Sequence, residues 1–124
     1  MLPLAQQVEE VRQRFPGATL TPTPEGFYLL IVPGVPLPPG WNMATTTLTI
    51  MVPAGYPNVK LDCFYADCGL CLAGGVAPKN SGVNVLAGQQ YRWFSWHTSS
   101  WDPHADTLDK YLRFCESRLV TAQP

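Results

Sequence analysis

The chain has 124 residues, enough for one domain spanning residues 1–124 but not for two. Hydrophobic residues make up 46% of it, which excludes a disordered chain, and charged residues only 14%. The net charge of −1 leaves no basic surplus to neutralise phosphates, so a nucleic-acid-binding function is disfavoured. No apolar run reaches the ~18 residues of a membrane span, and the N-terminus lacks the layout of a signal peptide. We therefore expect a cytoplasmic domain that binds no membrane.

The first predicted element is a helix near the N-terminus. Its apolar side chains recur at intervals of four, three and four residues: Leu4, Val8, Val11 and Phe15. This spacing places them on one face of a helix, because an α-helix has 3.6 residues per turn. Pro16 and Gly17 follow directly, and this pair is typical of a helix end. The helix is thus expected to cover a core with one apolar face.

Three strands are predicted next in the chain. Residues 27–32 form a short aromatic and β-branched run, which Pro33 is expected to end. Residues 45–52 alternate between larger apolar residues and mostly polar ones, as in a strand with one buried face. Residues 59–65 repeat this alternation and place Cys63 at an inward position. The short connections between these runs favour an antiparallel meander.

An irregular segment and a second helix complete the expected elements. Residues 67–88 contain five glycines and are predicted to lack regular structure. A stretch of this length without regular structure is usually functional or mobile in a small domain. Asp102 is expected to cap the final helix, with Pro103 at its first position. The buried stripe of this helix is predicted to comprise Leu108, Tyr111, Leu112, Cys115 and Leu119.

Two of the four cysteines are predicted to be structural. Disulfides are rare in the cytoplasm, so thiols are expected at all four positions. Cys63 falls on the inward face of the third predicted strand, and Cys115 falls on the apolar stripe of the last helix. A cysteine in such a place usually acts as a small buried hydrophobic side chain.

Cys68 and Cys71 form a Cys-x-x-Cys pair at the start of the irregular segment. Three functions are compatible with this pair. It could contribute to a zinc site, whose other ligands would come from His97, His104 or Cys63. It could be a redox dithiol, although the two glycines that follow disfavour the helix start which that motif needs. One of the thiols could instead be a nucleophile on a loop. Structural thiols on a buried loop explain the pair equally well.

A dense aromatic block covers residues 91–97, and its tryptophans are predicted to pack against the sheet. Ser95 and His97 would lie on the same face of this block if it is extended. A serine hydroxyl is a weak nucleophile until a base takes its proton, and His97 could supply that base. The pair is therefore a second candidate for nucleophilic chemistry.

Three short segments occur in an order that resembles ubiquitin-conjugating enzymes. Residues 52–57 (Val-Pro-Ala-Gly-Tyr-Pro) are similar to the Phe-Pro-x-x-Tyr-Pro turn of that family. Residues 69–72 (Gly-Leu-Cys-Leu) are similar to its catalytic stretch, and residues 101–103 (Trp-Asp-Pro) to its Trp-Ser-Pro motif. The resemblance extends from the first helix to about Leu119. The aromatic block and the short C-terminus look more like the bacterial branch of the superfamily.

The resemblance implies an α+β fold of the ubiquitin-conjugating type. In that fold an N-terminal helix precedes a four-stranded antiparallel meander, an irregular active-site segment and a C-terminal helix. Three features depart from the family pattern. The His-Pro-Asn tripeptide is absent, Lys60 and Leu61 replace the paired prolines, and 29 residues separate Cys71 from Trp101. Without the tripeptide another residue must orient the active-site loop, and Asn80 and Asn84 are nearby in the sequence.

The resemblance implies acyl transfer without a cofactor or metal. Cys71 would accept the C-terminal glycine of a ubiquitin-like protein from an activating enzyme, as a thioester, and pass it to a target protein. Cys68 is the rival nucleophile, three residues away. Ser95 would instead carry an oxyester, with His97 as the base or as a donor to the oxyanion. The alternative is a catalytically inactive module of the same fold that binds other proteins.

Overall fold

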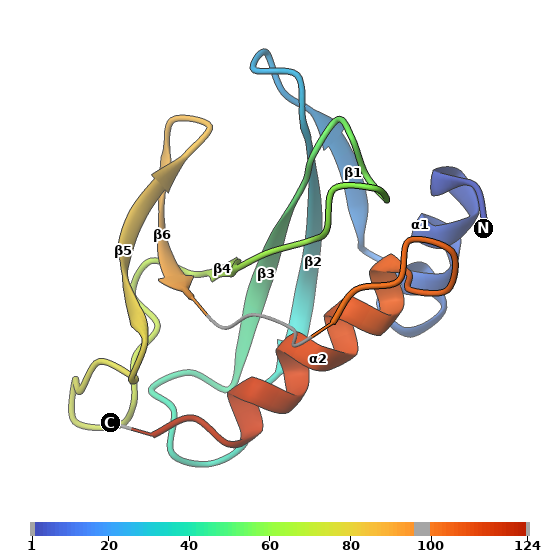
Figure 1. Ribbon diagram of the computed structural model, residues 1–124. Helices are drawn as coiled ribbons and strands as arrows, with labels where there is room; N and C mark the ends of the chain where they lie inside the picture. The colour runs from blue at the N-terminus through green and yellow to red at the C-terminus, as the bar shows by residue number, and fades with distance from the viewer. Residues whose placement is uncertain (1, 96–99, 124) are drawn as a thin grey trace.

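The computed structural model describes residues 2–95 and 100–123. In this part of the chain two helices pack on one face of a six-stranded antiparallel sheet, an α+β architecture broadly compatible with the ubiquitin-conjugating fold (Figure 1). The spatial order of the strands is β1-β2-β3-β4-β6-β5. The expected sheet had four strands, so its size was predicted wrongly. The elements are α1 (Leu4–Arg14), β1 (Thr19–Pro22), β2 (Tyr28–Pro36), β3 (Thr45–Val52), β4 (Phe64–Ala66), β5 (Ser81–Leu86), β6 (Gln89–Phe94) and α2 (Leu108–Val120).

Helix α1 forms as the apolar spacing predicts. Val8 and Val11 are buried, and the backbone N–H of Phe15 donates to the carbonyl of Val11 at 2.9 Å as the helix ends. The guanidinium of Arg14 binds the carboxylates of Asp109 and Glu116 on α2, at 2.9 and 3.1 Å. Helix α1 therefore lies against α2 rather than against the sheet alone, as Figure 1 also shows.

Strand β2 continues past the proline that was expected to end it. The pairing of β2 with β3 shifts register between Val32 and Val35, which is where Pro33 lies. A proline cannot donate a ladder hydrogen bond, so strands tolerate it at such a bulge. Gly34 has a φ of +74°, a value that glycine adopts without steric cost. The bulge allows the strand to reach Pro36.

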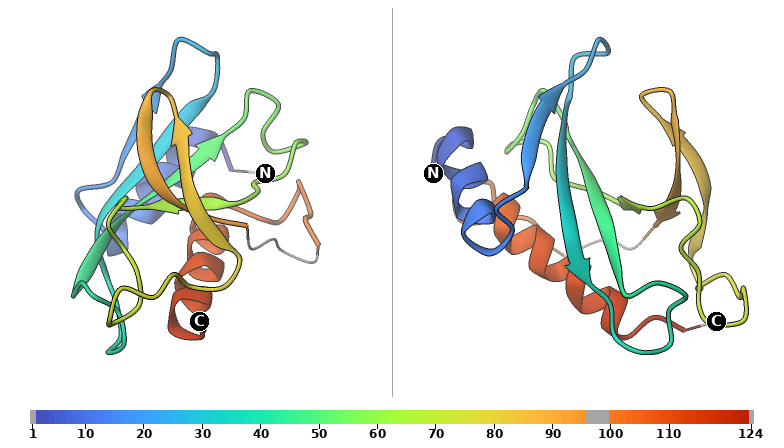
Figure 2. Two further views of the ribbon diagram at one scale, coloured as in Figure 1. Left: turned by 90° about the vertical axis from the view of Figure 1, so that its left-hand side faces the viewer. Right: turned by 180° about the vertical axis from the view of Figure 1, so that it is seen from behind.

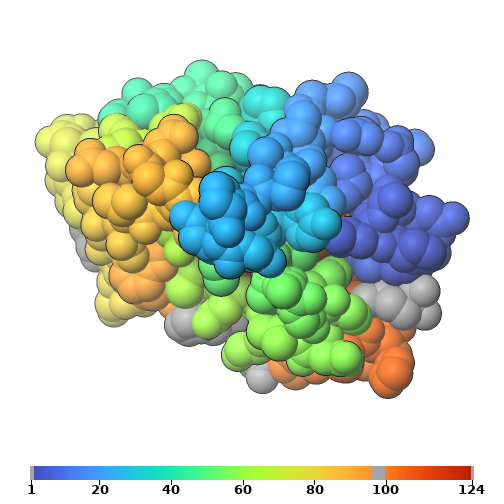
Figure 3. All heavy atoms as spheres, turned by 90° about the horizontal axis from the view of Figure 1, so that it is seen from above, coloured from blue at the N-terminus to red at the C-terminus, as the bar shows by residue number. Residues whose placement is uncertain are grey.

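The sheet has two apolar faces of unequal size. The larger core lies under the helices, where β3 contributes Leu48, Ile50 and Val52, all at most 1% exposed. On the opposite face a smaller cluster is formed by Leu29, Leu86 and Tyr91. The sheet is curved, and the β5–β6 hairpin therefore faces β2 on the side of the sheet opposite the helices (Figure 2). Figure 3 shows the end of this hairpin lying beside the β1–β2 end of the molecule.

Strand β4 is shorter than expected, and its alternation is shifted by one residue. Cys63 has a φ of +50°, and this change of backbone direction exchanges the inward and outward side chains before the strand begins. Phe64 and Ala66 therefore enter the main core, both at 0% exposure, whereas Cys63 and Tyr65 are only half-buried. The prediction that Cys63 is a buried core residue was wrong for this reason.

The segment at residues 67–88 is not irregular throughout. Ser81–Leu86 form β5, which pairs along its whole length with β6. Ala87 and Gly88 join the two strands, with φ values of +50° and +80°. Two positive φ values in a two-residue loop are typical of a tight β-hairpin turn. Such turns usually contain Asn-Gly or Asp-Gly, so Ala-Gly was a weak signal for this hairpin.

Helix α2 begins later than predicted. Thr107 is its N-cap and accepts a hydrogen bond from the backbone N–H of Lys110 at 3.2 Å. Asp102 instead starts a separate turn, in which its carbonyl accepts from the N–H groups of Ala105 and Asp106. The backbone N–H of Asp102 in turn donates to the Asp106 carboxylate at 2.7 Å. The predicted apolar stripe of α2 is confirmed, because all five of its residues are buried.

Gln7 connects three parts of the structure. Its side chain is 1% exposed, and its Oε1 accepts from the hydroxyl of Tyr56 at 2.6 Å and from the backbone N–H of Leu108 at 3.0 Å. Its Nε2 donates to the carbonyl of Leu2. Gln7 therefore joins α1, the loop after β3 and the start of α2. A polar side chain is stabilising in such a buried place only because its hydrogen bonds are made.

Replacing Gln7 by alanine is expected to lower the free energy of unfolding by about 2–3 kcal/mol, because two donors lose their acceptor in a buried place. The measurement is denaturant unfolding followed by circular dichroism. Gln6→Ala is the matched control: Gln6 is the adjacent glutamine, and it is exposed. Equal effects of the two replacements would show that the buried network does not stabilise the fold.

Candidate functional site

The Cys68–Cys71 pair lies on a turn that follows β4 and is held from both sides. The backbone N–H of Leu70 donates to the carbonyl of Asp67 at 2.9 Å and closes the turn. The Asp67 carboxylate accepts from the Thr46 hydroxyl at 2.9 Å and from the N–H of Thr47 at 3.3 Å, both on β3. On the other side Arg92 of β6 donates from Nε to the carbonyl of Leu70 at 2.8 Å. The cysteine turn is therefore fixed between two strands.

Asn42 fixes the second half of this turn. Its Oδ1 accepts from the backbone N–H of Cys71 at 3.0 Å, and its Nδ2 donates to the carbonyl of Gly69 at 2.9 Å. The backbone N–H of Asn42 also donates to the carbonyl of Cys71. The sequence did not indicate this residue, because it lies 29 positions before Cys71 and outside any recognisable motif. Only the fold brings the two segments together.

The four thiols differ in access and acidity. Cys68 is exposed, Cys71 and Cys63 are half-buried, and Cys115 is buried, as predicted for the last of these. Burial raises the pKa of the Cys115 thiol well above its ordinary value, and nearby Glu116 raises it further. Partial burial likewise raises the pKa of Cys63. Since the thiolate is the nucleophile, Cys63 and Cys115 are poorly suited to nucleophilic chemistry.

The second predicted nucleophile, Ser95, directly follows β6. Its hydroxyl donates to the carbonyl of Asn80 at 3.1 Å, and its backbone N–H donates to the same oxygen at 3.0 Å. His97, its expected base, and Trp96 lie outside the described residues. The side chain of Asn84, one of the two asparagines suggested by the sequence, accepts from the neighbouring N–H of Val85. Ser95 thus has its hydroxyl proton engaged by a backbone oxygen.

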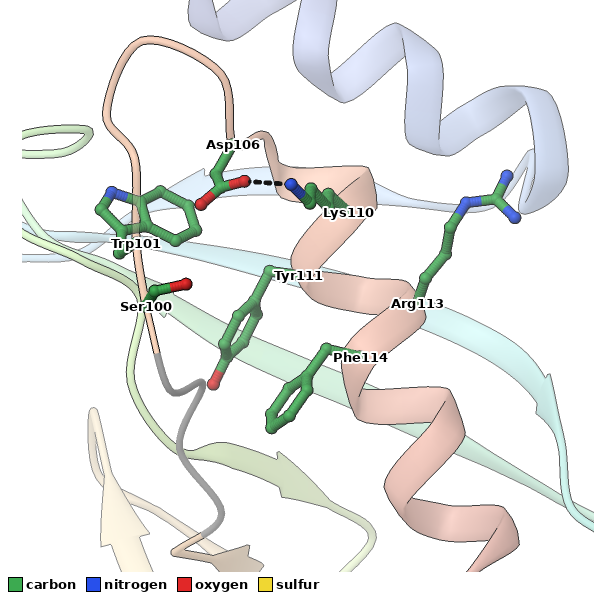
Figure 4. A pocket seen from close by; sticks show the side chains of 7 residues that line it. All are labelled: Ser100, Trp101, Asp106, Lys110, Tyr111, Arg113 and Phe114. Carbon is green, nitrogen blue, oxygen red and sulfur yellow. Dashed lines mark ion pairs between the residues drawn. The ribbon is translucent and has the colours of Figure 1, made fainter.

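The two outer family motifs meet near the start of α2. The indole Nε1 of Trp101 donates to the carbonyl of Pro57 at 2.8 Å, and its ring lies 5.8 Å from that of Tyr56. A pocket of about 450 Å³ opens beside Trp101, and an ion pair between Asp106 and Lys110 lies at its edge (Figure 4). None of Cys68, Cys71 and Ser95 lines this pocket. The two motifs therefore stabilise the fold near the start of α2, and the pocket beside them contains none of the candidate nucleophiles.

The described residues contain no group of three or more His, Cys, Asp or Glu side chains that could hold a metal ion. Neither Cys63 nor His104 joins the Cys68–Cys71 pair in such a group, so those two forms of the zinc hypothesis are wrong. The form that needs His97 lies outside the described residues. In residues 2–95 and 100–123 no helix has the length and apolar character needed to cross a membrane.

Replacing Asn42 by alanine is expected to loosen the cysteine turn. Two side-chain hydrogen bonds are lost at an exposed site, which should cost about 1 kcal/mol locally. Hydrogen exchange measured by NMR should show the Cys71 amide exchanging several-fold faster. Asn84→Ala is the control, because the described hydrogen bond of the Asn84 side chain is to the adjacent N–H of Val85, on the β5–β6 hairpin. Unchanged exchange at Cys71 in Asn42→Ala would contradict the assigned contact.

Comparison with known proteins gives one assignment. The sequence matches the family described as Prokaryotic E2 family E over residues 19–122, which is most of the chain and includes the cysteine turn and Trp101. No curated protein and no solved structure matches significantly. Because the match covers β1 to the end of α2, the chain belongs to the prokaryotic E2 family E, a family of ubiquitin-conjugating-like proteins.

Proposed function

We propose that this protein accepts a ubiquitin-like protein as a thioester on the Cys68–Cys71 turn and passes it to a target. Membership of a prokaryotic E2 family implies interaction with an activating enzyme and a ubiquitin-like protein in general. The observation that carries the proposal is the turn itself. It holds an exposed and a half-buried thiol, and bonds from both neighbouring strands and from Asn42 fix its backbone.

The chemistry is two successive acyl transfers. A thiolate of the turn attacks the carbonyl carbon of the thioester on the activating enzyme, and the carbon–sulfur bond to that enzyme breaks. The departing thiol takes up the proton that the attacking cysteine has lost. An amine of the target then attacks the new thioester, an amide forms, and the cysteine thiol is released. A thiol on a loop suits this sequence because two large proteins must reach it in turn.

Asn42 supplies the loop orientation for which the family uses its missing asparagine. It holds the backbone on both sides of Cys71, the residue that corresponds to the catalytic cysteine of the resembled motif. Cys68 is the more exposed thiol of the turn. Motif position thus favours Cys71, and accessibility favours Cys68.

Two other functions remain testable beside this one. An oxyester carrier would use Ser95, with His97 as base, but the Ser95 hydroxyl donates to a backbone oxygen and would have to leave it. An inactive binding module would use the same fold without acyl transfer. The missing tripeptide is compatible with such a module.

The test is a charging reaction with the protein, ATP, and an activating enzyme and ubiquitin-like protein from the same genome. The proposal predicts an adduct on a non-reducing gel that a thiol reductant removes. An adduct that resists the reductant but is cleaved by base, and is lost in Ser95→Ala, would favour the oxyester. No adduct with an activating enzyme that is shown to form its own thioester would favour the binding module.

A further inference from the structure

A cleft of about 400 Å³ lies beside the cysteine turn, on the face of the sheet opposite the helices. Strands β2 and β3 form one wall, and the start of β6 forms the other. The exposed Cys68 lines it together with Asp67, whereas Cys71 does not. Its volume is within the range of ligand-binding pockets, roughly 300–1,000 Å³. The other lining residues are Ile31, Thr47, Thr49, Gln89, Gln90 and Tyr91.

Thr49 places a hydrogen-bonding group at the floor of this cleft. Its side chain is only 2% exposed, and it lines the cleft from the centre of β3. Among the described residues its hydroxyl group makes no hydrogen bond, and it is open to the space of the cleft. A hydroxyl group can both donate and accept a hydrogen bond. A ligand in the cleft would therefore find this hydroxyl available without breaking a described hydrogen bond.

The backbone of the turn also distinguishes the two thiols. In the described part of the chain the N–H groups of Cys68 and Gly69 donate to no acceptor. The N–H of Cys71, in contrast, is bound to Asn42. Acyl transfer passes through a tetrahedral oxyanion, which free backbone N–H groups stabilise. The turn therefore offers such donors at Cys68 and none from the N–H of Cys71.

The composition of the cleft indicates the chemistry of its ligand. Thr47, Thr49, Gln89 and Gln90 provide both donors and acceptors, as an extended peptide backbone requires. No Lys or Arg lines the cleft, and Asp67 places a carboxylate next to Cys68. A peptide that ends in a free carboxylate would be repelled there. A peptide whose terminal carbonyl is bound in a thioester carries no such charge.

From these features we infer that Cys68 is the acyl acceptor and that the cleft binds the extended C-terminal tail of the incoming modifier; this inference rests on the proposed function. The Cys68 thiolate attacks the terminal carbonyl carbon of the tail, and the bond to the donor sulfur breaks. The donor thiol leaves with the proton that Cys68 lost. The cleft thus selects the activated, uncharged tail over the free acid.

The probe is a synthetic peptide thioester with an uncharged leaving group, the ethyl thioester of acetyl-Ala-Leu-Gly-Gly, which needs no activating enzyme. Intact-mass and peptide mapping should place the acyl group on Cys68, and the same peptide as a free acid should not compete. Thr47→Trp fills the cleft and should slow acylation of Cys68 at least tenfold. Thr45→Trp is the matched control, because Thr45 is exposed on the same strand and outside the cleft, and it should change the rate less than twofold.

Two further measurements keep the test independent of misfolding and of thiol reactivity. Thr49→Val removes only the unpaired hydroxyl and should slow acylation severalfold if Thr47→Trp fails to fold. Alkylation of Cys68 by iodoacetamide, which is small, should change less than threefold in every folded variant. An acyl group on Cys71, or equal rates in Thr47→Trp and Thr45→Trp, would overturn this inference. Either result leaves the proposed function standing, because that function fails only if the activating enzyme charges no thiol of the turn.

Discussion

Replacing Cys68 and Cys71 together by alanine is expected to abolish the reductant-sensitive adduct with the ubiquitin-like protein. The other two cysteines of the described residues are poorly suited to the reaction, because burial raises the pKa of both the Cys63 and the Cys115 thiol. The loss should exceed a hundredfold, since a serine or backbone oxygen cannot form a thioester. Quantitative non-reducing gels of the charging reaction provide the measurement.

The matched control replaces the other two cysteines, Cys63 and Cys115, by alanine. This variant should charge at the rate of the unmodified protein and chiefly lose stability, because Cys115 belongs to the main core. The single variants Cys68→Ala and Cys71→Ala then show how the reaction divides between the two thiols of the turn. A reductant-sensitive adduct that persists in the first double variant would show that the acyl group is carried elsewhere.

The largest effect on stability is expected for Phe94→Ala. The Phe94 ring is 0% exposed, stacks on Phe64 at 4.9 Å between centroids, and meets the edge of Trp41 at 6.3 Å. Its removal leaves a cavity where β4, β6 and the loop before β3 meet. Phenylalanine-to-alanine changes in such cores usually cost about 3–5 kcal/mol. Denaturant unfolding should therefore give a strongly lowered midpoint.

Val83→Ala is the control for this change. Val83 lies on β5 and is 57% exposed, so its truncation should cost less than about 1 kcal/mol. Comparable losses in the two variants would mean that the β4–β6 contact is not part of the cooperative core. Unchanged stability of Phe94→Ala would contradict the described packing altogether.

The helices and β3 were predictable because their patterns are local. The apolar residues of α1 and α2 recur at helical spacing, and in β3 Leu48, Ile50 and Val52 alternate with the side chains of the opposite face. The strand predictions were wrong where a single residue interrupts the alternation of inward and outward side chains. Cys63, with its positive φ, reverses the alternation before β4, and Pro33 lies at a bulge rather than at a strand end.

The β5–β6 hairpin was missed for a different reason. Its glycines are typical of irregular structure, and its turn is Ala-Gly rather than Asn-Gly. Its pairing with β4 is a long-range contact that no local pattern reveals. Helix α2 begins at Thr107 because Asp102 and Asp106 hydrogen-bond within a turn of their own, a use of aspartate that the sequence does not distinguish from a helix cap.

The candidate site was predictable only in part. The spacing of Cys68 and Cys71 and the order of the family motifs were visible in the sequence. The contact of Asn42 with Cys71 and the cleft beside Cys68 were not, because both depend on segments that are distant in the chain. These features form only when folding brings β3, β6 and the cysteine turn together.

The most direct test of the central claim is the intact mass of the protein after the charging reaction, quenched at mild pH without reductant. The account predicts a mass increase equal to that of the ubiquitin-like protein minus one water, and its complete removal by a thiol reductant. A charged activating enzyme together with an unmodified mass for this protein would contradict the account. An adduct that resists the reductant would contradict it as well.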